Sequence, residues 1–205
     1  DYTEAEIRAA VEAAATKNRD VAVHAHGTEG IKRATRAGVR SIEHSSMLDD
    51  EATALLKEKG VFIVPNPQSN AYMIERGPAG GYQDYQLRKS REVLQLKMES
   101  LRRAVKAGVL VAYGTDAGVQ PHGINGGQLR MYVEAGMTPL AALQSATLTA
   151  ARLLRQEAHL GRLAKGFAGD VIAVRGNPLE DIRVMESPVF VMKDGLPVKA
   201  GPASR

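Results

Sequence analysis

The run Val21-Ala22-Val23-His24-Ala25-His26 places two histidines at the end of a short apolar stretch, and two later runs share this arrangement. They are Ser41-Ile42-Glu43-His44 and Val111-Ala112-Tyr113-Gly114-Thr115-Asp116. Short apolar runs bounded by turn residues are typical of buried strands. Parallel strands that each end in a polar side chain would bring those side chains to one edge of a sheet. The sequence therefore predicts a catalytic or metal-binding edge.

The three strand-like runs 39–44, 61–66 and 109–114 also begin at comparable points. Aligned on the Gly-Val step that opens each of these runs, they bring His44, Asn66 and Gly114 to the same distance from their starts. His24 lies level with these residues if its own strand starts near Val21. A barrel of parallel strands has this property, because its polar residues follow the apolar part of each strand.

Composition limits the classes of protein to consider. The 205 residues are 44% hydrophobic and 24% charged, which is enough apolar material for one large domain and a small appendage. The longest apolar stretches are too short to cross a bilayer, so we expect no membrane segment. The chain has no cysteine, which excludes disulfides and thiolate ligands but does not assign a compartment. Basic residues are scattered among carboxylates and only six Tyr and three Phe are present, so we expect no nucleic-acid binding.

Helical patterns alternate with the strand-like runs. Thr3-Glu4-Ala5-Glu6 has the capping-box pattern of a helix start, and Gly38 and Gly60 are typical helix ends. Four strand–helix units follow from this alternation, which corresponds to half of an eight-stranded barrel. The expected helices cover residues 4–17, 28–37, 49–60, 90–107, about 128–135 and 139–155, the last with a break near Thr147; the expected strands are 21–25, 39–44, 61–64 and a last one that delivers Asp116.

Residues 65–89 show no convincing period. They contain Pro, Gly, Asn, Gln and three tyrosines, which predicts a long loop over the mouth of the site, and Ser90 is expected to cap the next helix. Tyr72 and Arg76 in this segment are candidates to bind a substrate side chain or carboxylate. A packed lid is the plainer interpretation of the same residues.

The character of the chain changes from about Gly161 onward. Two β-like runs, 170–174 and 189–193, are separated by Gly176-Asn177-Pro178 and followed by an Asp194-Gly195 turn. We therefore expect two domains, an α/β half barrel over residues 1–160 and a small β appendage over residues 161–205.

Several motifs occur in an order that resembles a known family. They are His24-Ala25-His26-Gly27, then residues 37–44, then Gly114-Thr115-Asp116-Ala117-Gly118, with further agreement at His122-Gly123, residues 135–139 and residues 166–170. The chain resembles the amidohydrolase superfamily, in its prolidase-like and imidazolonepropionase-like branch, from about Val21 to Val198. The resemblance implies the C-terminal half of a TIM-like (β/α)8 barrel, strands five to eight, followed by part of a small β-sandwich.

The resemblance also implies roles for individual residues. His24 would be the metal ligand after strand five, His44 the ligand after strand six, and Asp116 an acid after strand eight that touches the metal and moves the proton. His26 is expected as a neighbour that orients ligand or substrate, and His122 as a substrate contact or a solvated loop residue. One or two divalent ions, zinc by expectation, would be bound, since neutral imidazoles suit zinc. The plainer alternatives are hydrogen-bonded structural histidines and an Asp116 that caps a turn.

The implied activity is metal-dependent hydrolysis of an amide bond in a dipeptide or an N-acyl amino acid. A cyclic amide or imidazolone is the alternative substrate, and a non-catalytic half-barrel module is the alternative of a different class. The chain lacks the His-x-His pair of strand one and the modified lysine of strand four that the family carries. We therefore expect a segment before residue 1, leaving the localisation open, and activity only when an N-terminal half is present as a separate chain or missing segment.

A half barrel would also leave unpaired sheet edges. A second copy of the chain could cover such an edge, so we expect a homo-oligomer.

Overall fold

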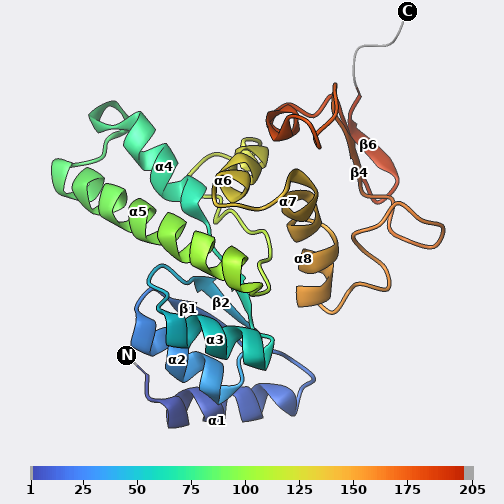
Figure 1. The fold of residues 1–205 in the computed structure, drawn as a ribbon. Coiled ribbons are helices and arrows are strands. Elements are labelled where there is room, and N and C mark those ends of the chain that lie inside the picture. Colours follow the sequence, from blue (N-terminus) through green and yellow to red (C-terminus); the bar gives the residue numbers. More distant parts are fainter. Residues whose placement is uncertain (1, 201–205) are drawn as a thin grey trace, which may run out of the picture. The chain divides into compact units, whose positions relative to one another are not determined.

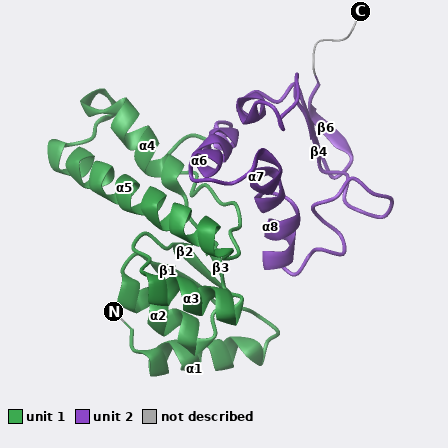
Figure 2. Ribbon diagram, viewed as in Figure 1, with its two compact units in different colours: residues 1–121 green, residues 122–205 purple. Residues whose placement is uncertain are grey.

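The computed structural model describes residues 2–200, and its α/β fold divides into two compact units, residues 1–121 and residues 122–205 (Figure 2). The sequence predicts another division, between a half barrel at residues 1–160 and a β appendage at residues 161–205. That division stays a prediction. Within the described residues, no helix combines the length and the apolar character needed to cross a bilayer.

A parallel sheet of three strands forms the centre of unit 1 (Figure 1). Strand β1 (Ala22–Ala25) pairs with β2 (Ser41–His44), and β2 pairs with β3 (Phe62–Val64), both in parallel. Parallel neighbours need a crossover connection, which helices α2 (Thr28–Ala37) and α3 (Asp50–Lys59) supply. These strands and helices confirm the expected alternation over the first sixty residues.

The helices of unit 1 begin and end where local chemistry predicts. Helix α1 (Glu4–Ala15) has the expected capping box, in which the Glu6 carboxylate accepts from the Thr3 N–H at 2.7 Å. Asp49 caps α3 by accepting from the Ala52 N–H at 2.7 Å. Both α2 and α3 end at a glycine in the left-handed conformation. The apolar faces of these two helices are buried at Ile31, Ala34, Ala37, Ala52 and Leu56.

The prediction of a long loop over residues 65–89 is wrong. Helix α4 (Pro67–Arg76) and the short helix η1 (Pro78–Gly80) occupy it, and α5 (Asp84–Ala107) begins six residues before the expected cap at Ser90. Pro67 does not break α4 because it stands in the first turn, where its missing N–H is not needed. Gln83 and Gln86 form the capping box of α5, and Ser90 is buried inside that helix.

The fourth expected strand is reduced to one bridge. Only Val111 pairs in parallel with Ile63 of β3, supported by bonds from the Ile63 N–H to the Leu110 carbonyl and from the Ala112 N–H to the Ile63 carbonyl. The chain then passes β3 closely, since a Cβ at Gly114 would lie 2.5 Å from Val64 Cγ1. Any larger residue at this position would force the Val64 side chain to shift.

Unit 2 combines short helices with an antiparallel sheet of order β4-β5-β6. The expected break near Thr147 is confirmed, because it separates two helices, and the β structure expected after Gly161 is present. The elements are η2 (Asn125–Gly127), α6 (Gln128–Glu134), α7 (Pro139–Ser145), α8 (Leu148–Leu153), β4 (Val171–Ala173), η3 (Ile182–Glu186), β5 (Phe190–Lys193) and β6 (Leu196–Lys199).

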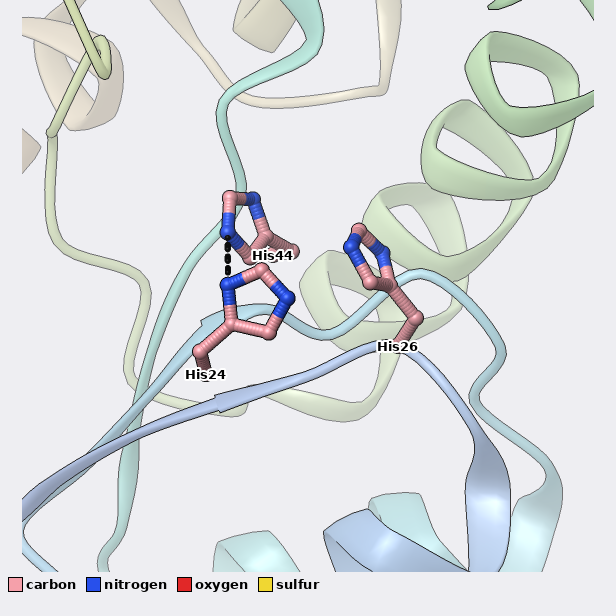
Figure 3. A group of neighbouring side chains, drawn as sticks. All are labelled: His24, His26 and His44. Carbon is pink, nitrogen blue, oxygen red and sulfur yellow. Dashed lines mark hydrogen bonds between the residues drawn. The ribbon is translucent and has the colours of Figure 1, made fainter. Parts of the chain in front are cut away.

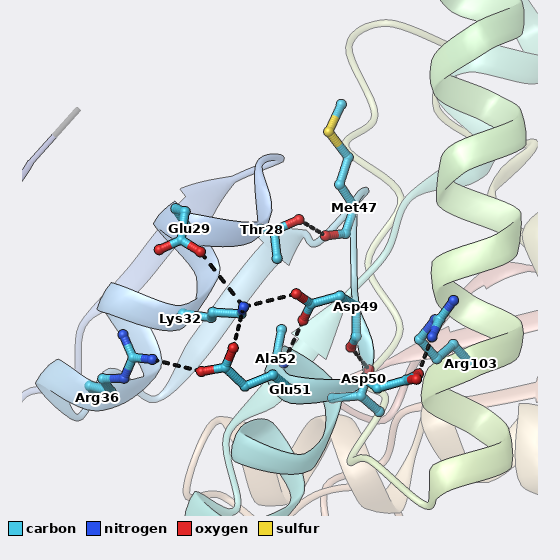
Figure 4. Close-up of polar contacts among 11 residues, drawn as sticks. Thr28, Glu29, Lys32, Arg36, Met47, Asp49, Asp50, Glu51, Ala52 and Arg103 are labelled. Carbon is cyan, nitrogen blue, oxygen red and sulfur yellow. Dashed lines mark hydrogen bonds and ion pairs between the residues drawn. The ribbon is translucent and has the colours of Figure 1, made fainter.

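An ion-pair cluster joins α2 to the start of α3 (Figure 4). The Lys32 side chain is only 7% exposed, and its ammonium lies 2.8 Å from Asp49 and 2.6 Å from Glu51. Arg36 adds a second bond to Glu51 at 3.0 Å. Hydrogen bonds from Lys32 lower the pKa values of both carboxyls and raise that of Lys32 itself.

We expect the substitution Lys32→Met to lower the melting temperature by several degrees at pH 7 and by much less near pH 3. The folded-state pKa values of Asp49 and Glu51 are depressed, so their stabilising effect is present above their unfolded values near 4 and is lost as protons bind. Circular dichroism melts between pH 3 and 7 test this, with exposed Lys59→Met as the control. A difference that stayed constant over this range would assign the effect to packing instead.

Candidate metal centre

Three histidines meet at the carboxyl edge of the parallel sheet (Figure 3). His24 lies in β1, His26 follows β1 directly, and His44 is the last residue of β2. His24 Nδ1 and His44 Nε2 are 2.8 Å apart, and one nitrogen from each of the three rings lies within 4.8 Å of the others. The structure therefore brings together both expected ligands and His26.

Strand geometry explains why His24 and His26 lie together and why the end of β2 lies beside them. The parallel register sets Ala25 opposite His44 and His24 opposite Glu43. Residues two apart in an extended chain share a face, so His26 points to the same side as His24. The His26 ring stacks on the His44 ring with centroids 4.7 Å apart and planes at 16°. His26 is thus in ring contact with both predicted ligands.

The backbone at the end of β2 is held in an uncommon conformation. His44 and Ser45 have φ values of 71° and 46°, which cost non-glycine residues about 1–3 kcal/mol each and persist only under strong constraint. The Ser45 N–H donates to the Ala25 carbonyl at 3.0 Å, and the Ser45 hydroxyl donates to the Ile42 carbonyl at 3.1 Å. These bonds turn the chain so that the His44 ring lies over β1.

A second layer of polar groups holds two of the rings. His26 Nδ1 lies 2.7 Å from the Ser46 hydroxyl, and His44 Nδ1 lies 2.7 Å from Asn66 Oδ1. The Lys97 ammonium, from α5, donates to the same Asn66 oxygen at 2.9 Å. Sequence reasoning placed Asn66 level with His44 but gave it no role, and it missed Lys97. A signal was available, because Lys97 interrupts the apolar stripe of α5 between Leu94 and Leu101.

Burial keeps two of the histidines neutral. It lowers the pKa of His26 to about 4, with smaller contributions from the charges of His44, His24 and Lys97. Burial also lowers the pKa of His44, although its bond to Asn66 acts in the opposite direction. Neutral imidazole is the form that binds metal ions. The donor set of imidazoles with a nearby carboxylate fits a divalent ion such as zinc.

Asp116 lies within electrostatic reach of the cluster. Its negative charge raises the pKa values of Glu43, His44 and Lys97, although desolvation by burial is the largest influence on each of them. The Asp116 side chain is exposed, and its φ of 54° is again positive. It is not among the three residues whose ligand atoms lie within 4.8 Å of one another, so its metal contact stays a prediction.

Three further residues were expected at the site, Tyr72, Arg76 and His122. Tyr72 is half-buried and Arg76 is exposed, both on α4 rather than on a loop. His122 is an exposed residue at the start of unit 2. Their roles in substrate binding stay predictions.

Comparison with known proteins assigns the family. Residues 1–198 match the model of the amidohydrolase family. The chain belongs to this family. It is 37% identical over 193 residues to ochratoxinase from Aspergillus niger, a match that covers 93% of this chain and 39% of that protein. This result confirms the resemblance inferred from the sequence motifs.

Solved amidohydrolase structures share the fold over half of their length. A Xaa-Pro dipeptidase structure with methionine bound in its active site has a TM-score of 0.90 and 43% identity, covering 98% of this chain and 50% of that chain. The structure of A. niger ochratoxinase has a TM-score of 0.79 and 36% identity, covering 100% and 47%. The amidohydrolase chain described here therefore spans about half the length of these relatives.

We expect His26 of the metal-free protein to stay neutral down to about pH 4, because burial and its histidine neighbours disfavour its charged form. Proton NMR of the ring C–H signals from pH 8 to pH 4 measures this directly. A His26 signal that titrates near the ordinary histidine value of about 6.5 would contradict this burial.

Proposed function

We propose that the protein carrying this chain is a metal-dependent hydrolase that cleaves the amide bond of a dipeptide or an N-acyl amino acid. The histidine cluster at the carboxyl edge of a parallel sheet carries the proposal, in a chain that belongs to the amidohydrolase family. Similarity to a Xaa-Pro dipeptidase and to ochratoxinase supports an amide substrate.

His24 and His44 would hold the ion through their ring nitrogens, with Asp116 as a further contact and His26 beside them. A divalent ion such as zinc would polarise the substrate carbonyl and bring the pKa of the attacking water close to neutrality. Asp116 then takes one proton from the attacking water and passes it to the nitrogen of the leaving amine. The amide is thereby converted into a carboxylate and an amine. The exposure of Asp116 suits this task, since an accessible carboxylate can reach both water and substrate.

The proposal includes a partner for the open sheet. Within the described residues β1 pairs with β2 alone, and the edge beyond β3 carries one bridge. Unpaired edges of this kind favour association with further strands. The N-terminal half of a (β/α)8 barrel, on a separate chain or as a further segment, would complete strands one to eight and add the missing ligands. Assembly into a homo-oligomer belongs to the same proposal.

We expect His44→Ala to abolish stoichiometric zinc binding and turnover, because it removes a ligand from the centre of the cluster. Asp116→Asn should retain zinc on the histidines while lowering kcat by about 10²- to 10⁴-fold, the usual loss when a general acid–base group is removed. Zinc content by elemental analysis and hydrolysis of dipeptides and N-acyl amino acids measure both effects. His159→Ala, an exposed histidine of unit 2, is the control and should leave both unchanged.

The substrate panel separates the alternatives. Ring opening of a cyclic amide without dipeptide cleavage would show that the substrate is a cyclic amide or an imidazolone instead. Absence of bound zinc together with absence of turnover in the assembled protein would overturn it and favour a non-catalytic module.

A further inference from the structure

Lys97 is a buried cation that the proposed reaction does not use. Its residue is 3% exposed on α5, and its ammonium donates to the side-chain oxygen of Asn66 at 2.9 Å and to the backbone oxygen of Asn66 at 3.3 Å. Burying a charge against neutral amide oxygens is costly. A role for Lys97 should therefore be sought in what it does to Asn66.

The contacts from Lys97 through Asn66 to His44 determine which atom is the donor and which is the acceptor in each hydrogen bond. An ammonium can only donate, so the Asn66 atom that faces Lys97 is the amide oxygen and not the NH2 group. The same oxygen lies 2.7 Å from His44 Nδ1. Because this oxygen can only accept, Nδ1 of His44 must carry the proton. A neutral imidazole carries one ring proton, which leaves Nε2 of His44 with its lone pair free.

The free nitrogen points into the cluster. His44 Nε2 is the atom that lies 2.8 Å from His24 Nδ1. The second polar contact in the cluster has no such constraint, since His26 Nδ1 faces the Ser46 hydroxyl, which can donate or accept. Of these two contacts, only that of His44 has a fixed hydrogen-bond direction, because the Asn66 oxygen can only accept.

We propose that Lys97 is a positioning residue that acts through Asn66 to select the His44 tautomer whose Nε2 can bind a metal ion. This inference rests on the proposed metal site at His24 and His44. Without the ammonium, the Asn66 amide can turn its NH2 group toward His44 Nδ1. That arrangement stabilises the opposite tautomer, in which Nε2 carries the proton and cannot act as a ligand.

The tautomer can be read without any metal. In the metal-free protein with 15N-labelled histidine at pH 7, where Lys97 carries its proton, we expect His44 to show a protonated Nδ1 and an unprotonated Nε2. In Lys97→Met the two nitrogens should shift toward average or reversed values. Lys106→Met makes the same change at an exposed position of the same helix and should leave the tautomer unchanged.

A double variant provides the rescue. Asn66→Asp, added to Lys97→Met, replaces the side-chain amide by a carboxylate. Both atoms of the carboxylate that can face His44 are oxygens, so His44 should regain the protonated Nδ1. If Lys97→Met does not fold, Lys97→Leu asks the same question, because a leucine side chain also offers Asn66 no hydrogen-bond donor. Zinc affinity, measured by competition with a chelator, should fall by about 10- to 100-fold in the single variant, as for other partners of metal ligands.

Two outcomes would overturn the inference. One is a protonated Nε2 on His44 in the unmodified protein. The other is a folded Lys97 variant, Met or Leu, whose tautomer matches that of the unmodified protein. If the tautomer follows Lys97 but the unmodified protein binds no zinc, the positioning role stands and the proposed function fails.

Discussion

The parallel hydrogen-bond register between β1 and β2 is the constraint on which the histidine site depends. It sets Ala25 opposite His44, so that the two strands end together and their last polar side chains meet. Paired residues point to the same face of a sheet, so this register alone would put His44 on the Ala25 side, opposite to His24. The positive φ values at His44 and Ser45 then turn the chain away from the sheet at this point. The site thus depends on this pairing together with the left-handed turn at its end.

Desolvation gives the site its chemistry. Burial lowers the pKa values of His26 and His44, so these two rings of the cluster remain uncharged near neutral pH. Uncharged imidazoles bind divalent ions, whereas protonated ones repel them. The surrounding polar groups add direction, because Asn66 and Lys97 determine which nitrogen of His44 carries the proton. The same burial that favours neutral imidazole lowers the pKa of Lys97 to about 8, so the charge of that residue is also maintained at a cost.

Much of unit 1 could be predicted from the sequence, because short-range signals specify it. The capping box at Thr3, the cap at Asp49 and the left-handed glycines at Gly38 and Gly60 each act within a single turn of helix. Helix α4 could not be predicted in this way. Pro65 and Pro67 indicated a break in the pattern, although Pro67 is compatible with the first turn of a helix.

The site was predictable only in part. His24 and His44 follow from strands that end together, but the closeness of His26 depends on the local geometry after β1. The reduction of the last strand to a bridge at Val111 depends on how closely residues 109–114 approach β3, which no local pattern specifies. The link from Lys97 to Asn66 spans 31 positions and exists only in the folded chain. Contacts of this range depend on packing between α5 and the end of β3.

The most direct test of this account is an anomalous-scattering map at the zinc edge from crystals of the protein grown with zinc. The account predicts one peak bonded to His24 and His44 at about 2.0–2.1 Å from a ring nitrogen of each. A map with no peak at these histidines, or with zinc bound only at other side chains, would contradict it.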